Sequence, residues 1–146
     1  MKTKVQELIK TKVSLAPMAG ITDFMMRDLI RNYTTESLLT TEMISSEFLR
    51  QVKGNIIEKK TEKSSPVSYQ ISGHKPEMMA EAGKYLSQFA DMIDINMGCP
   101  VNKVVKGQDG SALMRNPQLA IEIVKAVKEV IDVPLSVKFR LGYTVD

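Results

Sequence analysis

Short apolar segments separated by polar, turn-forming residues recur along the chain. Five of them have the length and composition of β-strands: Lys12–Ala16, Leu38–Met43, Pro66–Ser72, Met92–Met97 and Leu135–Arg140. Several are apolar runs without clean alternation, which is typical of strands covered on both faces of a sheet. The pattern therefore predicts a buried parallel sheet.

Helical periodicity fills the stretches between these strands. Asp23 is placed to cap a helix that runs to about Arg31. In Lys75–Phe89 the apolar residues share one helical face, namely Met78, Met79, Ala82, Leu86 and Phe89. Asn116 followed by Pro117 is typical of a helix start. The apolar stripe that follows consists of Leu119, Ala120, Ile123, Val124, Val127 and Val130.

The predicted strands begin at positions 12, 38, 66 and 92 and, after a longer interval, at 135. Repeated βα units indicate an α/β fold, either a doubly wound sheet or a barrel. No G-x-G-x-x-G follows the first strand, which disfavours the dinucleotide-binding version. We therefore predict a parallel (β/α)8 fold of the TIM-barrel type, of which this chain holds about the first five βα units. Because a barrel takes about 250 residues, we expect residues 1–146 to be the N-terminal portion of the barrel, whose open edges favour self-association.

Composition narrows the class of protein. The 146 residues are 43% hydrophobic and 25% charged, as in ordinary globular domains. No apolar run has the length of a membrane span, and no secretory signal is visible. One cysteine excludes an internal disulfide, and one histidine excludes a multi-histidine metal site. We expect a cytoplasmic protein without a metal; its net charge of +3 permits an RNA partner without requiring one.

Residues that could carry chemistry follow or end the predicted strands. They are Pro17, Met18 and Ala19 after the first strand, Glu42 in the second, Gln70 in the third, Asn96 and Cys99 at the fourth, and Lys138 and Arg140 in the fifth. In a barrel these positions converge on one mouth, where active sites lie. The long loop Met97–Ser111 after the fourth strand carries the cysteine to the same end. Amides, a thiol and a cation around one cavity suit a polar heteroaromatic ligand.

Each candidate also has a purely structural interpretation. Cys99 could be a small buried filler, and Gln70 could satisfy a neighbouring backbone group. Glu42 could pair with an arginine, whereas His74, just before Pro76, is interpreted as a surface turn residue. Lys138 is flanked by apolar residues in a strand expected to be covered, so its charge must face a cavity or a partner. Lys59, Lys60 and Lys63 are interpreted as a solvated loop rather than an RNA contact.

Six segments together resemble the tRNA-dihydrouridine synthases, most closely the bacterial B-type branch. They cover nearly the whole chain in the family's order and are Leu15–Asp23, Thr41–Ser45, Gln70–Gly73, Asp94–Pro100, Gly110–Met114 and Val137–Gly142. The resemblance implies an FMN enzyme that uses NADPH to reduce the 5,6 double bond of uridines in tRNA. It also implies that the flavin-phosphate site and a helical tRNA-binding domain lie beyond residue 146, so this chain alone is expected to hold FMN weakly and to be inactive.

The resemblance assigns a role to each candidate residue. Pro17, Met18 and Ala19 would pack against the flavin, Gln70 would bind its polar edge, and Lys138 would stabilise its reduced, anionic form. The uridine would be held by Asn96, with Glu42 and Arg140 beside it, and Cys99 would act as the general acid. An ordinary thiol is protonated at neutral pH and can donate without a special pKa shift.

Two alternatives remain open from the residues. An FMN barrel of the dihydroorotate dehydrogenase type would act on a small molecule instead of tRNA. A non-catalytic βα module would serve only RNA binding or assembly.

Overall fold

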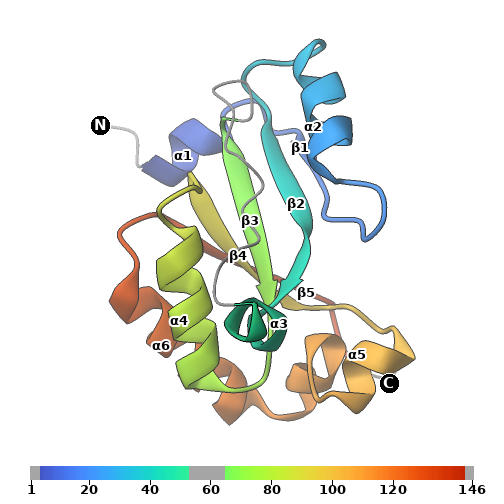
Figure 1. Ribbon diagram of the computed structural model, residues 1–146, viewed down its shortest axis with the longest axis vertical. Helices are drawn as coiled ribbons and strands as arrows, with labels where there is room; N and C mark the ends of the chain where they lie inside the picture. Colours follow the sequence, from blue (N-terminus) through green and yellow to red (C-terminus); the bar gives the residue numbers. More distant parts are fainter. Residues whose placement is uncertain (1–3, 53–64, 144–146) are drawn as a thin grey trace.

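The computed structural model describes residues 4–52 and 65–143, so Lys59, Lys60 and Lys63 lie outside the described residues. Five parallel strands form one curled sheet in the order β1-β2-β3-β4-β5 (Figure 1). Their bounds are β1 Ser14–Leu15, β2 Leu38–Ser45, β3 Val67–Ser72, β4 Met92–Met97 and β5 Leu135–Phe139. A doubly wound sheet reverses its strand order at a switch point. The unbroken order confirms a half-barrel of the (β/α) type.

Helices connect the strands throughout the described part of the chain. Their bounds are α1 Lys4–Leu8, α2 Phe24–Arg31, α3 Ser46–Gln51, α4 Pro76–Leu86, α5 Asn102–Lys106 and α6 Pro117–Val130, with a 3-10 helix, η2, at Gly110–Arg115. The three helices predicted from periodicity are confirmed as α2, α4 and α6. The pattern missed α1, α3 and α5, because helices of five or six residues have too few turns to show a periodic stripe.

Side chains at the helix starts explain where two of these helices begin. The carboxylate of Asp23 accepts a hydrogen bond from the Met26 amide at 2.9 Å, and Asn116 does the same for Leu119 at 3.2 Å. Both satisfy amides that have no partner inside the helix. The predicted caps of α2 and α6 are therefore confirmed.

Several element boundaries and the burial of one residue differ from the sequence prediction. Strand β2 runs two residues past the predicted Met43, β3 begins one residue after Pro66, and β5 ends one residue before Arg140. Lys12 has a φ of 58°, which no strand residue adopts, so β1 begins at Ser14 instead of position 12. Helix α4 ends at Leu86, three residues before the predicted Phe89. In α6 the last member of the predicted stripe, Val130, is 38% exposed, because the helix ends there and Ile131 packs into the core instead.

The two faces of the sheet differ in chemistry. Along β3, Val67, Tyr69 and Ile71 join the hydrophobic core with the helices, while Ser68, Gln70 and Ser72 point to the opposite, inner face. The same alternation continues in β4 and β5, where Asp94, Asn96, Ser136 and Lys138 are the inner residues. The apolar core thus lies between sheet and helices, where α4 packs against α6 (Figure 1). The sequence interpretation had missed this alternation.

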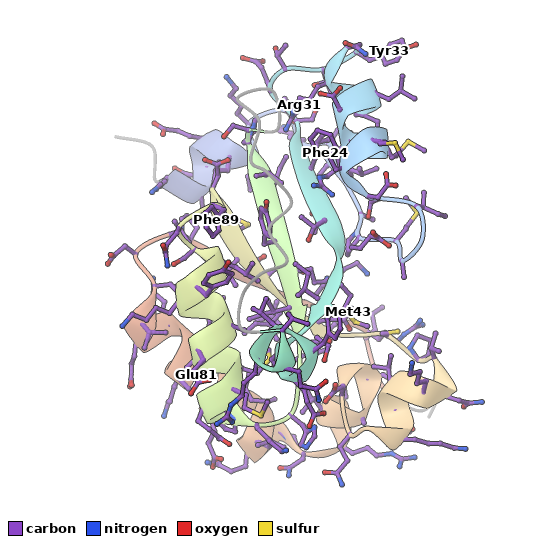
Figure 2. The ribbon with its side chains drawn as sticks, viewed as in Figure 1. Phe24, Arg31, Tyr33, Met43, Glu81 and Phe89 are labelled. Carbon is purple, nitrogen blue, oxygen red and sulfur yellow. The ribbon has the colours of Figure 1, made fainter. Side chains whose placement is uncertain are left out.

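The amino ends of the strands are tied together by a buried arginine. Arg31, at the end of α2, donates from Nη1 to the Ser37 carbonyl at 2.8 Å and from Nη2 to the Pro66 carbonyl at 2.6 Å, next to the starts of β2 and β3 (Figure 2). In barrels this end serves stability and the carboxyl end carries the chemistry.

No helix in residues 4–52 and 65–143 is long and apolar enough to cross a bilayer.

Candidate active site

A cavity of about 230 Å³ opens at the carboxyl ends of the strands. It is lined by Pro17, Ala19, Met43, Gln70, Asn96, Gly98, Cys99, Pro100, Lys138 and Arg140. Most candidates named from the sequence are therefore gathered around one space, although they come from segments spread over most of the chain. Parallel strands explain this, because their carboxyl ends share one edge of the sheet.

Two candidates do not line this cavity. Met18 lies on the same turn as Pro17 but is 38% exposed. Glu42 lines a neighbouring cavity with Thr41 and Met43, and its Oε1 accepts a hydrogen bond from the Gly20 amide at 2.5 Å. Its bond is thus to the backbone of the first turn instead of to an arginine, and it fixes the position of the turn that carries Pro17 and Ala19.

A chain of buried hydrogen bonds sets the orientation of the two amides. Asp94 accepts from Ser136 Oγ and from Gln70 Nε2, both at 2.6 Å. Because an ionised carboxylate only accepts, Gln70 must turn its NH₂ to Asp94 and its oxygen to Asn96. Asn96 donates a hydrogen bond from Nδ2 to Gln70 Oε1 at 2.9 Å. The side-chain oxygen of Asn96 is then left to accept hydrogen bonds from the loop after β4. A single carboxylate therefore determines which way both amides point.

The loop that carries the thiol is held by this last oxygen. Asn96 Oδ1 accepts from the amides of Gly98 at 3.1 Å and Cys99 at 3.0 Å. On its other side, the Cys99 carbonyl accepts from the Ser111 amide at 3.0 Å. The half-buried Cys99 is thus fixed through its backbone from both directions.

The two cations of β5 behave differently. Arg140 donates from Nε to the Gly98 carbonyl at 2.6 Å, so it also supports the thiol loop. Lys138 lines the cavity, and its ammonium has no hydrogen-bond or ion-pair partner within the described ranges 4–52 and 65–143. The expectation that both faces of this strand are covered was wrong for its end, since Phe139 is 65% exposed. The cavity is therefore lined by an exposed ammonium that can meet an anionic group.

His74 also differs from its interpretation as a surface turn residue. Its Nδ1 lies 2.8 Å from Asp109 Oδ1, and the two side chains are only 29% and 20% exposed. Burial raises the pKa of the Asp109 carboxyl above its ordinary value; the hydrogen bond and charge of His74 oppose the shift, Glu47 adds to it and Lys75 opposes it. This pair joins the end of β3 to the loop that carries the thiol.

Sequence reasoning missed three residues that shape the site: Asp94, Asp109 and Gly110. A carboxylate within the apolar strand Met92–Met97 was a usable signal for Asp94, because a buried charge needs partners. For Asp109 the sequence offered only its place in the long loop, whereas Gly110 opens one of the segments that carry the family resemblance.

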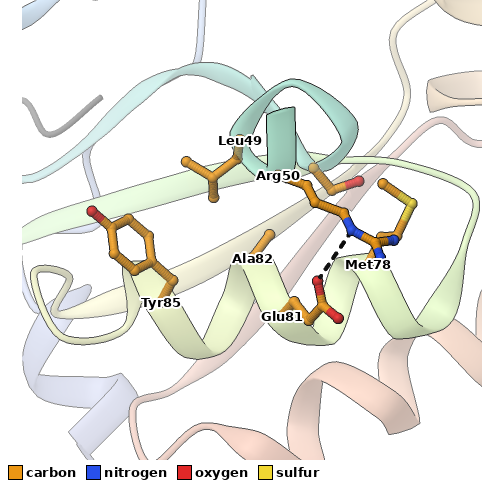
Figure 3. A pocket seen from close by; sticks show the side chains of 7 residues that line it. Leu49, Arg50, Met78, Glu81, Ala82 and Tyr85 are labelled. Atoms are coloured by element: carbon orange, nitrogen blue, oxygen red, sulfur yellow. Dashed lines mark ion pairs between the residues drawn. The ribbon is translucent and has the colours of Figure 1, made fainter. Parts of the chain in front are cut away.

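A further groove of about 250 Å³ lies on the helical side, between α3 and α4 (Figure 3). Leu49, Ala82 and Tyr85 form its apolar part, and Arg50 lies 3.9 Å from Glu81 across it. None of the candidate residues lines this groove. Among the described residues no cluster of three His, Cys, Asp or Glu side chains could hold a metal ion.

Comparison with known proteins assigns the family. The family model described as "Dihydrouridine synthase (Dus)" matches residues 14–146. The "Probable tRNA-dihydrouridine synthase 1" of Synechocystis is 40% identical over 138 residues, covering 92% of this chain and 39% of the relative. The "tRNA-dihydrouridine synthase B" of Shewanella oneidensis is 41% identical over 138 residues, with 92% and 42% covered.

The "tRNA-dihydrouridine(20/20a) synthase" of Vibrio parahaemolyticus is 39% identical over 132 residues, with 90% of this chain and 40% of the relative covered. The chain thus spans about two fifths of the length of these curated relatives. The match extends over all five strands and over every residue that lines the cavity. On this evidence the chain belongs to the dihydrouridine synthase family.

Proposed function

We propose that this chain contributes the first five βα units to the catalytic barrel of an FMN-dependent tRNA-dihydrouridine synthase. The enzyme reduces the C5–C6 double bond of specific uridines in tRNA with NADPH as the reductant. One observation carries the proposal: a single cavity gathers a thiol, two oriented amides and an ammonium without a partner among the described residues. The names of the relatives, all tRNA-dihydrouridine synthases, agree with it.

The residues present fit a flavin. The ammonium of Lys138, which has no partner in the described part of the chain, would offer the cation that a reduced, anionic flavin requires. Gln70 still has one N–H and one lone pair for the polar edge of the ring, since Asp94 and Asn96 each occupy only one of its sites. The turn with Pro17, Met18 and Ala19 supplies an apolar wall that can pack on a flat ring. When bound, FMN would supply the hydride that goes to C6 of the uracil, and NADPH would reduce the flavin again.

Cys99 completes the reduction as the general acid. As the hydride adds to C6, negative charge develops at C5 and O4, and the Sγ–H bond breaks to deliver its proton to C5. The resulting thiolate is reprotonated from solvent, so the cysteine is not consumed. The double hold on the Cys99 backbone serves this step, because proton transfer demands a donor within hydrogen-bond reach.

Substrate binding falls to the remaining polar residues. A uridine must leave its stack to enter a cavity at the end of a barrel. Asn96 presents an amide to the uracil edge, and Arg140 lies at the rim, where it can meet a phosphate or the ring. Glu42 lies beside these residues and supports the site by accepting a hydrogen bond from the Gly20 amide in the turn after β1.

The proposal is tested in the full-length protein that contains this chain. Deleting its gene should remove dihydrouridine from one or more tRNA positions, as seen by nucleoside mass spectrometry. Wild type should restore the modification and Cys99→Ala should not. An unchanged tRNA profile, together with accumulation or loss of a small-molecule substrate, would favour a barrel of the dihydroorotate dehydrogenase type. Full restoration by Cys99→Ala would favour the non-catalytic module.

Flavin binding has its own matched pair of variants. Lys138→Met in the full-length protein should weaken FMN retention and slow reduction by NADPH. Lys128→Met removes an equal charge from the exposed surface of α6 and should change neither. Equal behaviour of the two variants would remove Lys138 from the cofactor site.

A further inference from the structure

The loop after β4 leaves the sheet at Cys99 and returns to the same residue. It runs outward through α5 and comes back at Gly110 and Ser111, where the Ser111 amide binds the Cys99 carbonyl. The return is close: a Cβ placed on Gly110 would lie 2.6 Å from the Cys99 carbonyl oxygen and 3.1 Å from its Cβ. Residues 110 and 111 therefore help to fix the Cys99 backbone, on the side opposite to its hydrogen bond with Asn96.

This return uses backbone conformations that cost free energy. Gln108 has a φ of 64° and Gly110 a φ of 60°, and both lie in the left-handed region. A side chain at position 108 makes that conformation unfavourable in an isolated loop. Asp109, between them, is extended. The Asp109 amide donates to the Val104 carbonyl at 3.1 Å and its carbonyl accepts from the Ala112 amide at 3.2 Å. A contact made by the Asp109 side chain adds to this backbone hold on the returned loop.

His74 supplies that contact from a rigid base. Its Nδ1 lies 2.8 Å from Asp109 Oδ1, and both side chains are largely shielded from solvent. The preceding residue, Gly73, is packed so tightly between α3 and α4 that an added Cβ would lie 2.2 Å from Ser46 Oγ and 2.8 Å from Met79 Sδ. The backbone that carries His74 has little room to move.

We propose that His74 and Asp109 are positioning residues that lock the returned loop and thereby hold the Cys99 thiol at the cavity. Neither side chain lines the cavity, so they act through Gly110 and Ser111. The catalytic meaning of this lock rests on the proposed function, whereas the lock itself is a property of this chain.

The lock differs from an ordinary surface ion pair. Lys10 and Glu36 lie 2.5 Å apart but are 47% and 58% exposed, and pairs of this kind contribute little. The His74–Asp109 pair is more buried, and it bridges two segments that no strand pairing joins. Lys10–Glu36 therefore provides a matched control at a distance from the thiol.

The test uses this chain, in which Cys99 is the only cysteine, so that alkylation with iodoacetamide reports on one site. Hydrogen exchange of the Ser111 amide reports on the return itself. His74→Ala and Asp109→Ala should each speed exchange at Ser111 by about tenfold or more, as expected for losing one hydrogen bond to a charged group. Both should also raise the alkylation rate several-fold. Glu36→Ala should change neither rate.

His74→Asn serves as the rescue variant, because its Nδ2 lies two bonds from Cβ, as the histidine Nδ1 does. Both rates should return to within about twofold of wild type, which a general loss of stability would not allow.

The lock is refuted if His74→Ala and Asp109→Ala leave both rates unchanged, or if exchange rises equally in all strands and His74→Asn fails to restore it. These readouts need neither FMN nor tRNA. A chain without synthase activity would therefore still decide the question, and a working synthase with unchanged rates would refute only the lock.

Discussion

Replacing Gly110 by alanine tests how closely the thiol loop packs on itself. Alanine at a φ of 60° costs roughly 1–2 kcal/mol, because its Cβ crowds the following carbonyl. The new Cβ would also lie 2.6 Å from the Cys99 carbonyl oxygen, a backbone atom that cannot swing aside. Moving that oxygen breaks its bond to the Ser111 amide, which contributes about 0.5–1.5 kcal/mol. We expect Gly110→Ala to lower the free energy of unfolding by about 2–3 kcal/mol in total.

Gly20→Ala separates the two costs. Gly20 has a φ of 74°, yet no heavy atom lies within 4 Å of a Cβ built there. Gly20→Ala should therefore lower the free energy of unfolding only by the conformational cost of the positive φ, roughly 1–2 kcal/mol. Urea unfolding of both variants, extrapolated to water, measures the difference, and iodoacetamide labelling shows whether Cys99 has moved.

Two results would contradict this reasoning. If both variants lose the same stability, the close approach of Gly110 to Cys99 has no energetic weight. If Gly110→Ala is less stable but labels at the wild-type rate, the strain is relieved without displacing the thiol.

Three further predictions concern single contacts. Asn116→Ala should lower the free energy of unfolding by about 1 kcal/mol, measured with urea, because the Leu119 amide at the start of α6 loses its cap. Asp94→Asn should cost about 1–3 kcal/mol and shift the side-chain amide resonances of Gln70 and Asn96. The two hydrogen bonds go to different oxygens of Asp94, and one of these oxygens becomes an NH₂ group that cannot accept. Ser136→Ala removes only one of those bonds and should leave the amide resonances nearly unchanged. Asp109→Asn should alter the pH dependence of stability, because burial raises the pKa of Asp109 in the folded chain. As pH rises from the ordinary 3.8 through the raised pKa, wild type should lose stability relative to the variant. Urea unfolding at several pH values across that range measures this loss, and a constant difference between the two proteins would contradict it.

The sequence was sufficient for the elements with strong local signals. Strand Met92–Met97 and the caps Asp23 and Asn116 were placed correctly, and the start of the strand at Leu38 was as well, although that strand runs on to Ser45. Apolar runs and capping side chains act within a few residues, which is why they can be read from the sequence. The parallel order followed from the repeat of βα units. Convergence of Gln70, Asn96, Cys99 and Lys138 then followed from barrel geometry alone.

Contacts between distant segments could not be predicted in this way. His74 and Asp109 are far apart in the chain, and only the folded loop brings them together. The hydrogen bond between Glu42 and the Gly20 amide depends on the position of a turn from another unit, so the sequence could not indicate it. The orientation of the amides depends on Asp94, whose partners lie on two other strands. Local patterns place elements, whereas such pairings are decided by the packing between them.

The separation of the two sheet faces has a consequence for how this protein tolerates change. Substitutions at Ile71, Ile93 or Val127 remove hydrophobic burial and will reduce the amount of folded protein in the cell. Substitutions at positions such as Lys138 or Arg140 leave that burial intact. Residues that line the cavity can therefore change without loss of the hydrophobic burial that keeps the chain folded. In a mutational survey, substitutions that lower protein abundance should map to the helix-facing side of the strands, and substitutions tolerated by the fold should map to the inner side.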